Sequence, residues 1–150
     1  MSFLGSFDIS ASGMSAQRIR MDVAAENIAN VDTTRTENGE AYHRKDVVFE
    51  SYGAGSFKEA LINAERGRGF HASKTAGVRV SRIITDDRDM KRVYNPTHPD
   101  ADQDGYVEMP NVDVLKETVD SMSATRSYEA NVTALNAMKA MAQKALEIGK

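Results

Sequence analysis

The chain has 150 residues, a formal net charge of −3, three histidines and no cysteine. That length predicts one domain, or one small domain with extensions. The weak negative charge does not favour nucleic acid or anionic lipid as a partner, and the missing cysteine excludes disulfides, thiolate catalysis and Cys-ligated zinc. No apolar run reaches the roughly 18 residues that a membrane-spanning helix needs. The first residues lack a basic and then apolar leader pattern, so we expect no cleaved secretory signal.

Residues 1 to 31 are predicted to form a helix. One apolar face recurs at seven-residue spacing and contains Phe7, Met14, Met21 and Ile28. We expect Asp8 or Ser10 to cap the start of the helix and Asn30 to end it in left-handed geometry. The apolar face is typical of a helix packed in its own core, and a coiled-coil-like seam that also meets other subunits is the alternative.

The middle of the chain differs in kind from its ends. A polar linker, Asp32 to Asn38, precedes a region that holds most of the glycines and all three prolines. Runs rich in β-branched and aromatic residues predict strands at Ala41 to Glu50, Gly77 to Thr85 and Lys91 to Tyr94. Between the first two we expect mostly loop, with one short helical stretch at Phe57 to Ala64. The middle is therefore a small β-rich insertion.

A second, longer helix is predicted from Asn111 to Ile148, where neither glycine nor proline interrupts the chain until the end. Its apolar positions form a stripe with one six-residue step and include Val112, Leu115, Val119, Met122, Tyr128, Val132, Leu135 and Met138. Such a helix would reach roughly 57 Å, longer than the diameter of about 40 Å of a compact domain of this size. We therefore expect neighbouring subunits to cover part of the stripe. The predicted fold is mainly α, with the two terminal helices paired as a coiled-coil-like layer.

The sharpest chemical motif lies just before this second helix. Its acidic residues follow the spacing of a calcium-binding loop and are Asp100, Asp102, Asp104 and Glu108. Asn111 stands where the bidentate glutamate should be, and the preceding prolines do not suit an entering helix. The alternative is a set of Asx turns leading into a helix capped by Asn111. No cofactor is expected. His43, His71 and His98 have no partner at metal or catalytic spacing, so we do not expect an enzyme.

The stretch from residue 22 to 33 resembles the N-terminal signature of bacterial flagellar rod and hook proteins. The matching positions are Asn27, Ile28, Ala29, Asn30 and Thr33. Within that group, three further stretches resemble the proximal-rod type: Tyr94 to Pro99, Gly105 to Val112 and Arg126 to Asn136. The sequence departs from the wider group at Thr34 to Thr36, where Pro-Gly is often found.

The resemblance implies a structural axial subunit that assembles helically into the rod, the drive shaft that crosses the periplasm for motility. It implies export through the flagellar type III apparatus, and contacts with other rod subunits, copies of itself and membrane-ring or rod-base components. Residues 1–35 and 111–150 would then form the inner helical layer, with residues 36–110 outside. The expected subunit-packing residues are Phe7, Met14, Met21, Asn27, Ile28, Asn30, Val119, Met122, Tyr128, Val132, Leu135 and Met138. A calcium-responsive binding module is the alternative function.

Overall fold

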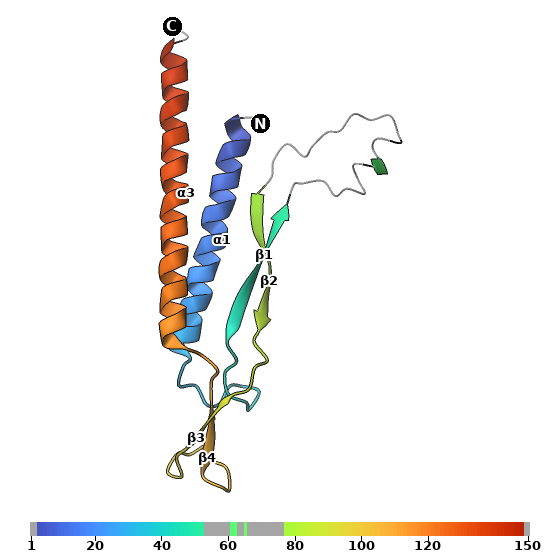
Figure 1. The fold of residues 1–150 in the computed structure, drawn as a ribbon, viewed down its shortest axis with the longest axis vertical. Coiled ribbons are helices and arrows are strands. Elements are labelled where there is room, and N and C mark those ends of the chain that lie inside the picture. The colour runs from blue at the N-terminus through green and yellow to red at the C-terminus, as the bar shows by residue number, and fades with distance from the viewer. Residues whose placement is uncertain (1–2, 53–60, 63–64, 66–76, 149–150) are drawn as a thin grey trace. The chain divides into compact units, whose positions relative to one another are not determined.

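The computed structural model describes residues 3–52, 61–62, 65 and 77–148. Within these residues, two long helices and four short strands follow one another in chain order (Figure 1). The elements are α1 (Phe3–Ala29), β1 (Lys45–Tyr52), β2 (Gly77–Thr85), β3 (Lys91–Tyr94), β4 (Tyr106–Met109) and α3 (Val114–Ile148). The described part is thus mainly α with small β-sheets between the two helices. No helix in this part is long and apolar enough to cross a membrane.

The chain divides into two compact units, each of which takes part of both helices. The first unit contains Met1–Arg18, Phe49–Ser81 and Thr125–Lys150, and the second unit contains Ile19–Val48 and Arg82–Ala124. In each unit, residues of α1 contact residues of α3, so the predicted packing of the two helices is confirmed.

The predicted N-terminal helix is confirmed as α1, but both of its expected ends are wrong. The helix begins at Phe3, so Asp8 and Ser10 lie inside it and do not cap it. At the other end Asn30 donates its side-chain amide to the carbonyl oxygen of Glu26 at 2.9 Å. No described residue other than glycine has a positive φ. Asn30 therefore does not adopt left-handed geometry, and its side chain adds a second hydrogen bond to a carbonyl that already accepts the Asn30 backbone amide at 3.1 Å.

The predicted C-terminal helix is confirmed as α3, again with a different cap. The helix begins at Val114, and Asp113 accepts hydrogen bonds from the amides of Leu115 and Lys116 at 3.0 and 3.4 Å. A carboxylate at this position satisfies helix amides that have no partner within the helix. Asn111 is not the cap, because its side chain bonds to other segments of the second unit.

The strands follow the sequence pattern closely, with one omission. β2 and β3 have the predicted bounds, whereas β1 starts four residues later than expected and continues to Tyr52. β3 pairs with the unpredicted strand β4 in antiparallel register, from Lys91 opposite Met109 to Tyr94 opposite Tyr106. β1 and β2 form a second two-stranded sheet. The expected helical stretch at Phe57 to Ala64 lies outside the described residues, apart from Leu61 and Ile62, which are helical.

In the first unit, small residues allow close approach between elements. Ser12 on α1 accepts a hydrogen bond from the amide of Val78 at 3.1 Å, which joins the helix to the start of β2. A Cβ added to Gly77 would lie 2.7 Å from the Ser12 hydroxyl, so no larger residue fits there without movement. At the next residue of α1, a Cβ added to Gly13 would lie 3.0 to 3.2 Å from the side-chain amide of Asn131.

The apolar stripe predicted along α3 changes face at its six-residue step. Before the step, Leu115, Val119 and Met122 are 75%, 59% and 54% exposed. After it, Tyr128 and the apolar residues that follow at helical spacing are half-buried. Residues three and four apart share a face, so the two halves of the pattern lie on different sides of the helix. The six-residue step therefore divides the predicted stripe into two faces, and the face before the step is the more exposed one.

Candidate functional site

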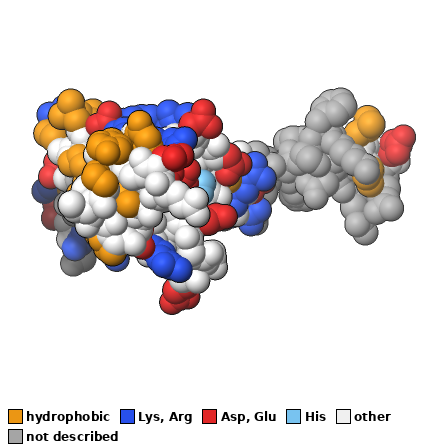
Figure 2. Space-filling view, turned by 90° about the horizontal axis from the view of Figure 1, so that it is seen from below, with side chains coloured by type: hydrophobic (Ala, Val, Ile, Leu, Met, Phe, Trp, Pro, Cys, Tyr) orange, Lys and Arg blue, Asp and Glu red, His pale blue; other side chains and the backbone are white. Residues whose placement is uncertain are grey.

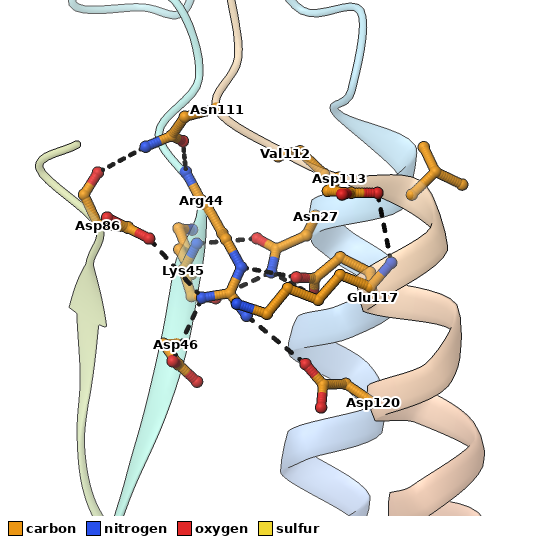
Figure 3. A network of polar contacts seen from close by, with 12 residues as sticks. Asn27, Arg44, Lys45, Asp46, Asp86, Asn111, Val112, Asp113, Glu117 and Asp120 are labelled. Atoms are coloured by element: carbon orange, nitrogen blue, oxygen red, sulfur yellow. Dashed lines mark hydrogen bonds and ion pairs between the residues drawn. The ribbon is translucent and has the colours of Figure 1, made fainter. Parts of the chain in front are cut away.

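A buried ion pair lies where α3 meets the segment before β1 in the second unit. The Nε atom of Arg44 donates to Oε1 of Glu117 at 2.6 Å, and the two side chains are only 7% and 2% exposed (Figure 3). Burial opposes the charge on Arg44, but the hydrogen bond and attraction from Glu117 outweigh it and raise the pKa of Arg44. Arg44 therefore stays charged beside Glu117 inside the unit.

Three further carboxylates surround the guanidinium of Arg44. Asp46 accepts a hydrogen bond from Nη1 at 3.2 Å, and carboxylate oxygens of Asp86 and Asp120 lie 3.9 and 3.8 Å from Nη1 and Nη2. Asp120 also pairs with Arg20 of α1 at 3.1 Å. Arg44 thus sits among acids from α3, β1 and the end of β2, and its planar fork suits such a multidentate role.

The side-chain amide of Asn27, near the end of α1, pairs with the backbone amide and carbonyl of Lys45, as the backbone of a neighbouring strand would. Its amide nitrogen donates to the carbonyl oxygen of Lys45 at 2.8 Å, and its oxygen accepts from the Lys45 amide at 2.9 Å. The same side chain donates to Glu117 at 2.9 Å and accepts from the Tyr42 hydroxyl at 3.0 Å. Asn27 has no exposed surface, and these four bonds satisfy its full capacity.

Tyr42 and Asn111 complete this group of hydrogen-bonded residues, Tyr42 by bonding to Asn27 and Asn111 by bonding to the backbone of Arg44. Burial, with the negative charges of Glu26 and Glu117, raises the pKa of Tyr42 to about 12, so its hydroxyl remains a donor to Asn27. Asn111 accepts from the backbone amide of Arg44 at 2.8 Å. It also donates to the carbonyl oxygen of Asp86 at 2.9 Å, which ties the chain before α3 to the sheet of β1 and β2.

We define the polar tie as Asn27, Tyr42, Arg44, Asn111 and Glu117. Its members come from α1, from the segment before β1 and from both sides of the start of α3. All five engage one another or backbone groups, and no bound substrate is needed to satisfy them. The arrangement holds segments together by directional bonds. Such a bonded cluster makes the contacts between these segments rigid.

The second signature asparagine acts locally. Asn30 accepts a hydrogen bond from the hydroxyl of Thr33 at 3.1 Å, in addition to its bond to the Glu26 carbonyl. The backbone amide of Tyr42 then donates to the carbonyl of Thr33 at 3.1 Å. Asn30 and Thr33 of the signature therefore stabilise the turn after α1. The bond between Thr33 and the backbone of Tyr42 holds Tyr42 close to the polar tie.

The acidic residues proposed for calcium are used in other ways. Asp102 accepts hydrogen bonds from the amides of Asp104 and Tyr106 and pairs with Arg92 at 3.0 Å, and these hydrogen bonds lower its pKa. This is the Asx turn of the alternative interpretation. Asp100 instead accepts from the Thr34 hydroxyl at 2.8 Å. Among the described residues no three acids or histidines lie where they would hold a metal ion, so a calcium loop gains no support from them.

The other predicted packing residues lie in different settings. Val119 and Met122 are exposed on α3. A larger group is half-buried and contains Phe7, Met14, Met21, Ile28, Asn30, Tyr128, Val132, Leu135 and Met138. Tyr128 is contacted by Arg18 of α1, whose guanidinium carbon lies 6.0 Å from the ring centre. The structure thus collects only Asn27 of the predicted set in the polar tie.

Sequence reasoning missed Arg44 and Glu117, because charged residues are usually assigned to the surface. One signal was available. Glu117 lies two residues from both Leu115 and Val119, which places it on the side of the helix away from them. If the Leu115 side were taken as exposed, Glu117 would face the rest of the unit.

Comparison with known protein families matches both ends of the chain. Residues 7–35 match the family described as flagella basal body rod protein. Residues 103–148 match the family described as flagellar basal body rod FlgEFG protein C-terminal. The two matched segments contain Asn27 of α1 and Glu117 of α3, which the polar tie joins.

Curated relatives match the chain over its full length. A flagellar basal-body rod protein FlgC of Bacillus subtilis is 53% identical over 154 residues, with all of both chains covered. The protein of the same name in Escherichia coli O6:H1 is 43% identical over 150 residues, also with full coverage. That of Borreliella burgdorferi is 40% identical and covers 99% of this chain and 98% of its own. The chain therefore belongs to the FlgC family of flagellar basal-body rod proteins.

Proposed function

We propose that this chain is a structural subunit of the bacterial flagellar basal-body rod. The observation that carries the proposal is the full-length similarity to proteins named for that role, at 53% identity in one case. The polar tie supports it, because the tie uses its charged residues for holding segments in place and not for chemistry on a substrate. The calcium-responsive alternative has no support in the described residues.

The partners proposed for the chain are other axial components of the flagellum. They comprise other rod subunits, copies of the chain itself, components of the rod base or membrane ring, and the export apparatus that delivers the subunit. The names of the relatives place those proteins in the basal body. The proposed location is the part of the rod that crosses the periplasm, and the proposed route is export without a cleaved signal peptide.

Helical assembly is the finer part of the proposal. Residues 1–35 and 111–150 would form a coiled-coil-like inner layer in the assembled rod, with residues 36–110 outside it. Support comes from α3, whose only buried residues are Glu117 and Ala124. A helix stabilised mainly by packing needs more cover than these two positions supply. Neighbouring subunits would provide it, and folding of the helix ends would be coupled to assembly.

The exposure and the hydrogen bonds of the predicted subunit-packing residues narrow the list of candidates. Val119 and Met122 remain candidates, because more than half of each residue is exposed. Asn27 leaves the set, because all four of its hydrogen bonds are made inside its own subunit. The half-buried residues of both helices remain candidates for contacts that form on assembly.

The proposal is tested by complementation. The chain is expressed in a Bacillus subtilis strain that lacks its own FlgC, and motility and purified basal bodies are examined. We expect restored swimming and the chain in the rod fraction, with the strain's own FlgC as the positive control. A stable, full-length chain that is absent from basal bodies, in cells that remain non-motile, would contradict the proposal.

A further inference from the structure

A tight turn between α1 and β1 contains an Asn-Gly pair, Asn38 and Gly39. Both residues are exposed. Backbone bonds close the turn: the Thr36 amide donates to the Glu40 carbonyl at 2.8 Å, and the Gly39 amide donates to the Thr36 carbonyl at 2.9 Å. Gly39 has a φ of 85°, a left-handed conformation that glycine adopts without strain. The pair therefore lies in the part of the turn that solvent reaches.

The surroundings of the pair leave it free to react. The side chain of Asn38 forms no hydrogen bond with a described residue. A Cβ added to Gly39 would meet no atom within 4 Å, so there is open space around its backbone. Only the bond from the Gly39 amide to Thr36 restrains the Gly39 nitrogen. When that bond opens, the Asn38 side chain and the Gly39 nitrogen can approach each other.

The two groups form a nucleophile and an electrophile within one short stretch of chain. Because glycine has no Cβ, the side chain before it can reach the following nitrogen without a clash. A reaction between two groups held in the same segment is much faster than one between separate molecules. The Gly39 nitrogen and the amide carbon of Asn38 therefore need only a rotation of the chain between them to meet.

We propose that Asn38 is a site of spontaneous deamidation in the folded chain, with water as the co-substrate. The Gly39 nitrogen gives its proton to a solvent base and attacks Cγ of Asn38. The new bond from nitrogen to Cγ closes a succinimide ring, the bond from Cγ to Nδ2 breaks, and ammonia leaves with a proton from solvent. Water then adds to either carbonyl of the ring and breaks its bond to the ring nitrogen. The products are aspartate and isoaspartate at position 38. This proposal does not depend on the proposed rod function.

The other asparagines of the described residues lack this combination of features. Their side chains donate to carbonyl oxygens, or a proline without an amide proton follows them, or they lie inside α3, where the following amide is bonded in the helix. In this order they are Asn27, Asn30, Asn111 and Asn131, then Asn95, then Asn136. We therefore expect deamidation to be selective for Asn38 among them.

The second glycine with a left-handed backbone gives an internal comparison. Gly105 follows Asp104, which can close the same ring more slowly because it must lose water instead of ammonia. A Cβ added to Gly105 would lie 3.0 Å from the Tyr94 ring and 3.2 Å from Pro96, and the Asp104 amide is held by Asp102 at 2.9 Å. The chain has little room to rotate there. We therefore expect little isoaspartate at position 104.

Conversion of Asn38 adds a negative charge next to other acids. The neighbouring Gly39 and Glu40 line a hollow of about 450 Å³, whose other acidic residues are Asp100, Asp102 and Glu108. Figure 2 shows exposed acidic side chains at several places on the face seen from below. The new carboxylate is exposed, so its repulsion by these acids is weak in water.

The isoaspartyl product also lengthens the backbone by one methylene group. The two backbone bonds between Thr36 and its partners in the turn depend on the present length of the chain. Tyr42 follows two residues after Glu40, and its backbone bond to Thr33 holds it close to the polar tie. We therefore expect the isoaspartyl form to be less stable than the original chain, and the aspartyl form to be nearly as stable.

The reaction is tested on the purified full chain, incubated in mildly alkaline buffer. Peptide mapping by mass spectrometry detects the replacement of NH2 by OH, and methyl transfer by an isoaspartyl methyltransferase detects isoaspartate. We expect both signals at position 38. The folded chain should convert about five- to tenfold more slowly than the urea-unfolded chain, because one hydrogen bond must open first. Conversion at position 38 confined to the unfolded chain would overturn the proposal.

Two variants serve as matched controls. Asn38→Gln has a side chain one methylene longer, which closes a ring less readily, and should show almost no conversion. Equal methyl transfer to Asn38→Gln and to the original chain would place the isoaspartate elsewhere and overturn the proposal. Asn38→Asp carries the charge without the longer backbone. Its urea midpoint should stay close to that of the fresh chain, while the isoaspartyl-containing chain unfolds at lower urea. An equal loss in Asn38→Asp would overturn the backbone effect.

Discussion

The two compact units solve the same task, the joining of α1 to α3, by different means. In the second unit the helices are joined by directional polar bonds, with Asn27 and Arg44 both reaching Glu117. In the first unit they meet through Gly13 beneath Asn131 and through Arg18 against Tyr128. Directional bonds fix one register, whereas close approach at a glycine tolerates small shifts. The polar tie of the second unit therefore favours one register of the two helices.

The largest expected effect comes from breaking the buried ion pair of the second unit. Arg44→Met leaves Glu117 buried without its cation and should lower the free energy of unfolding by about 3 to 5 kcal/mol. Urea unfolding followed by circular dichroism measures the loss. The double variant Arg44→Met with Glu117→Leu removes both charges and should regain part of the stability. If the single and double variants were equally destabilised, the loss would not come from the unpaired charge of Glu117. The ion pair would then not be what fixes the register of the two helices.

A second test compares the two signature asparagines. Asn27→Ala leaves the backbone groups of Lys45 and the Tyr42 hydroxyl without their buried partner, and should cost about 2 to 3 kcal/mol. Asn30→Ala removes two less buried bonds at the end of the helix, to the Glu26 carbonyl and from the Thr33 hydroxyl, and should cost about 1 kcal/mol. The same urea titration ranks the two variants. A larger loss for Asn30→Ala would show that the turn, and not the polar tie, holds the second unit together.

A third test addresses the first unit. Gly77→Ala would place a methyl group 2.7 Å from the Ser12 hydroxyl and 2.8 Å from the Tyr52 ring, and the forced shift should cost about 1 to 2 kcal/mol. Gly13→Ala is the matched control. It meets only the side chain of Asn131, at 3.0 to 3.2 Å, and gains helix propensity, so it should cost less than Gly77→Ala. A strongly destabilised Gly13→Ala variant would show that this helix contact is as exacting as the polar tie.

The smallest expected effect is a loss of folding stability at acidic pH. Hydrogen bonding to Arg88 outweighs burial and lowers the pKa of Asp86 from 3.8 to about 2. A carboxyl whose pKa is lower in the folded state stabilises that state above its unfolded pKa, and this contribution disappears as the pH falls through the folded pKa. Melting temperature should therefore drop between about pH 4 and pH 2. Asp86→Asn should flatten that part of the profile, and an unchanged slope would assign the acid response to other carboxylates.

The sequence predicted where the helices and strands lie better than it predicted which of their faces are buried. The alternation of Val78 and Val80 with polar residues placed β2 correctly, because that pattern depends on local chain geometry. Periodicity also revealed that Leu115, Val119 and Met122 share a side of α3. It could not reveal that this side is exposed, since a period identifies an apolar face without saying whose surface covers it. β4 was missed because the acidic, glycine-containing run before it is typical of a turn.

The candidate site was harder to predict than the fold. Asn27 stood out only through resemblance to a family signature, and its partners Arg44 and Glu117 lie far from it in the sequence. Whether a charged residue is buried depends on which segments meet around it, and that is a property of the tertiary structure. Asp113 was overlooked as a helix cap because Asn111, two residues earlier, is an equally good candidate by residue type.

The four bonds of Asn27 have a mechanical consequence. A pull along β1 reaches Lys45, whose amide and carbonyl are both held by this one side chain at the end of α1. Both bonds then bear the load together instead of opening one after the other, and the bond to Glu117 passes part of it on to α3. Shear between strand and helices is thus shared at a single point. In a rotating rod, these bonds would keep β1, α1 and α3 of a subunit in register under torque.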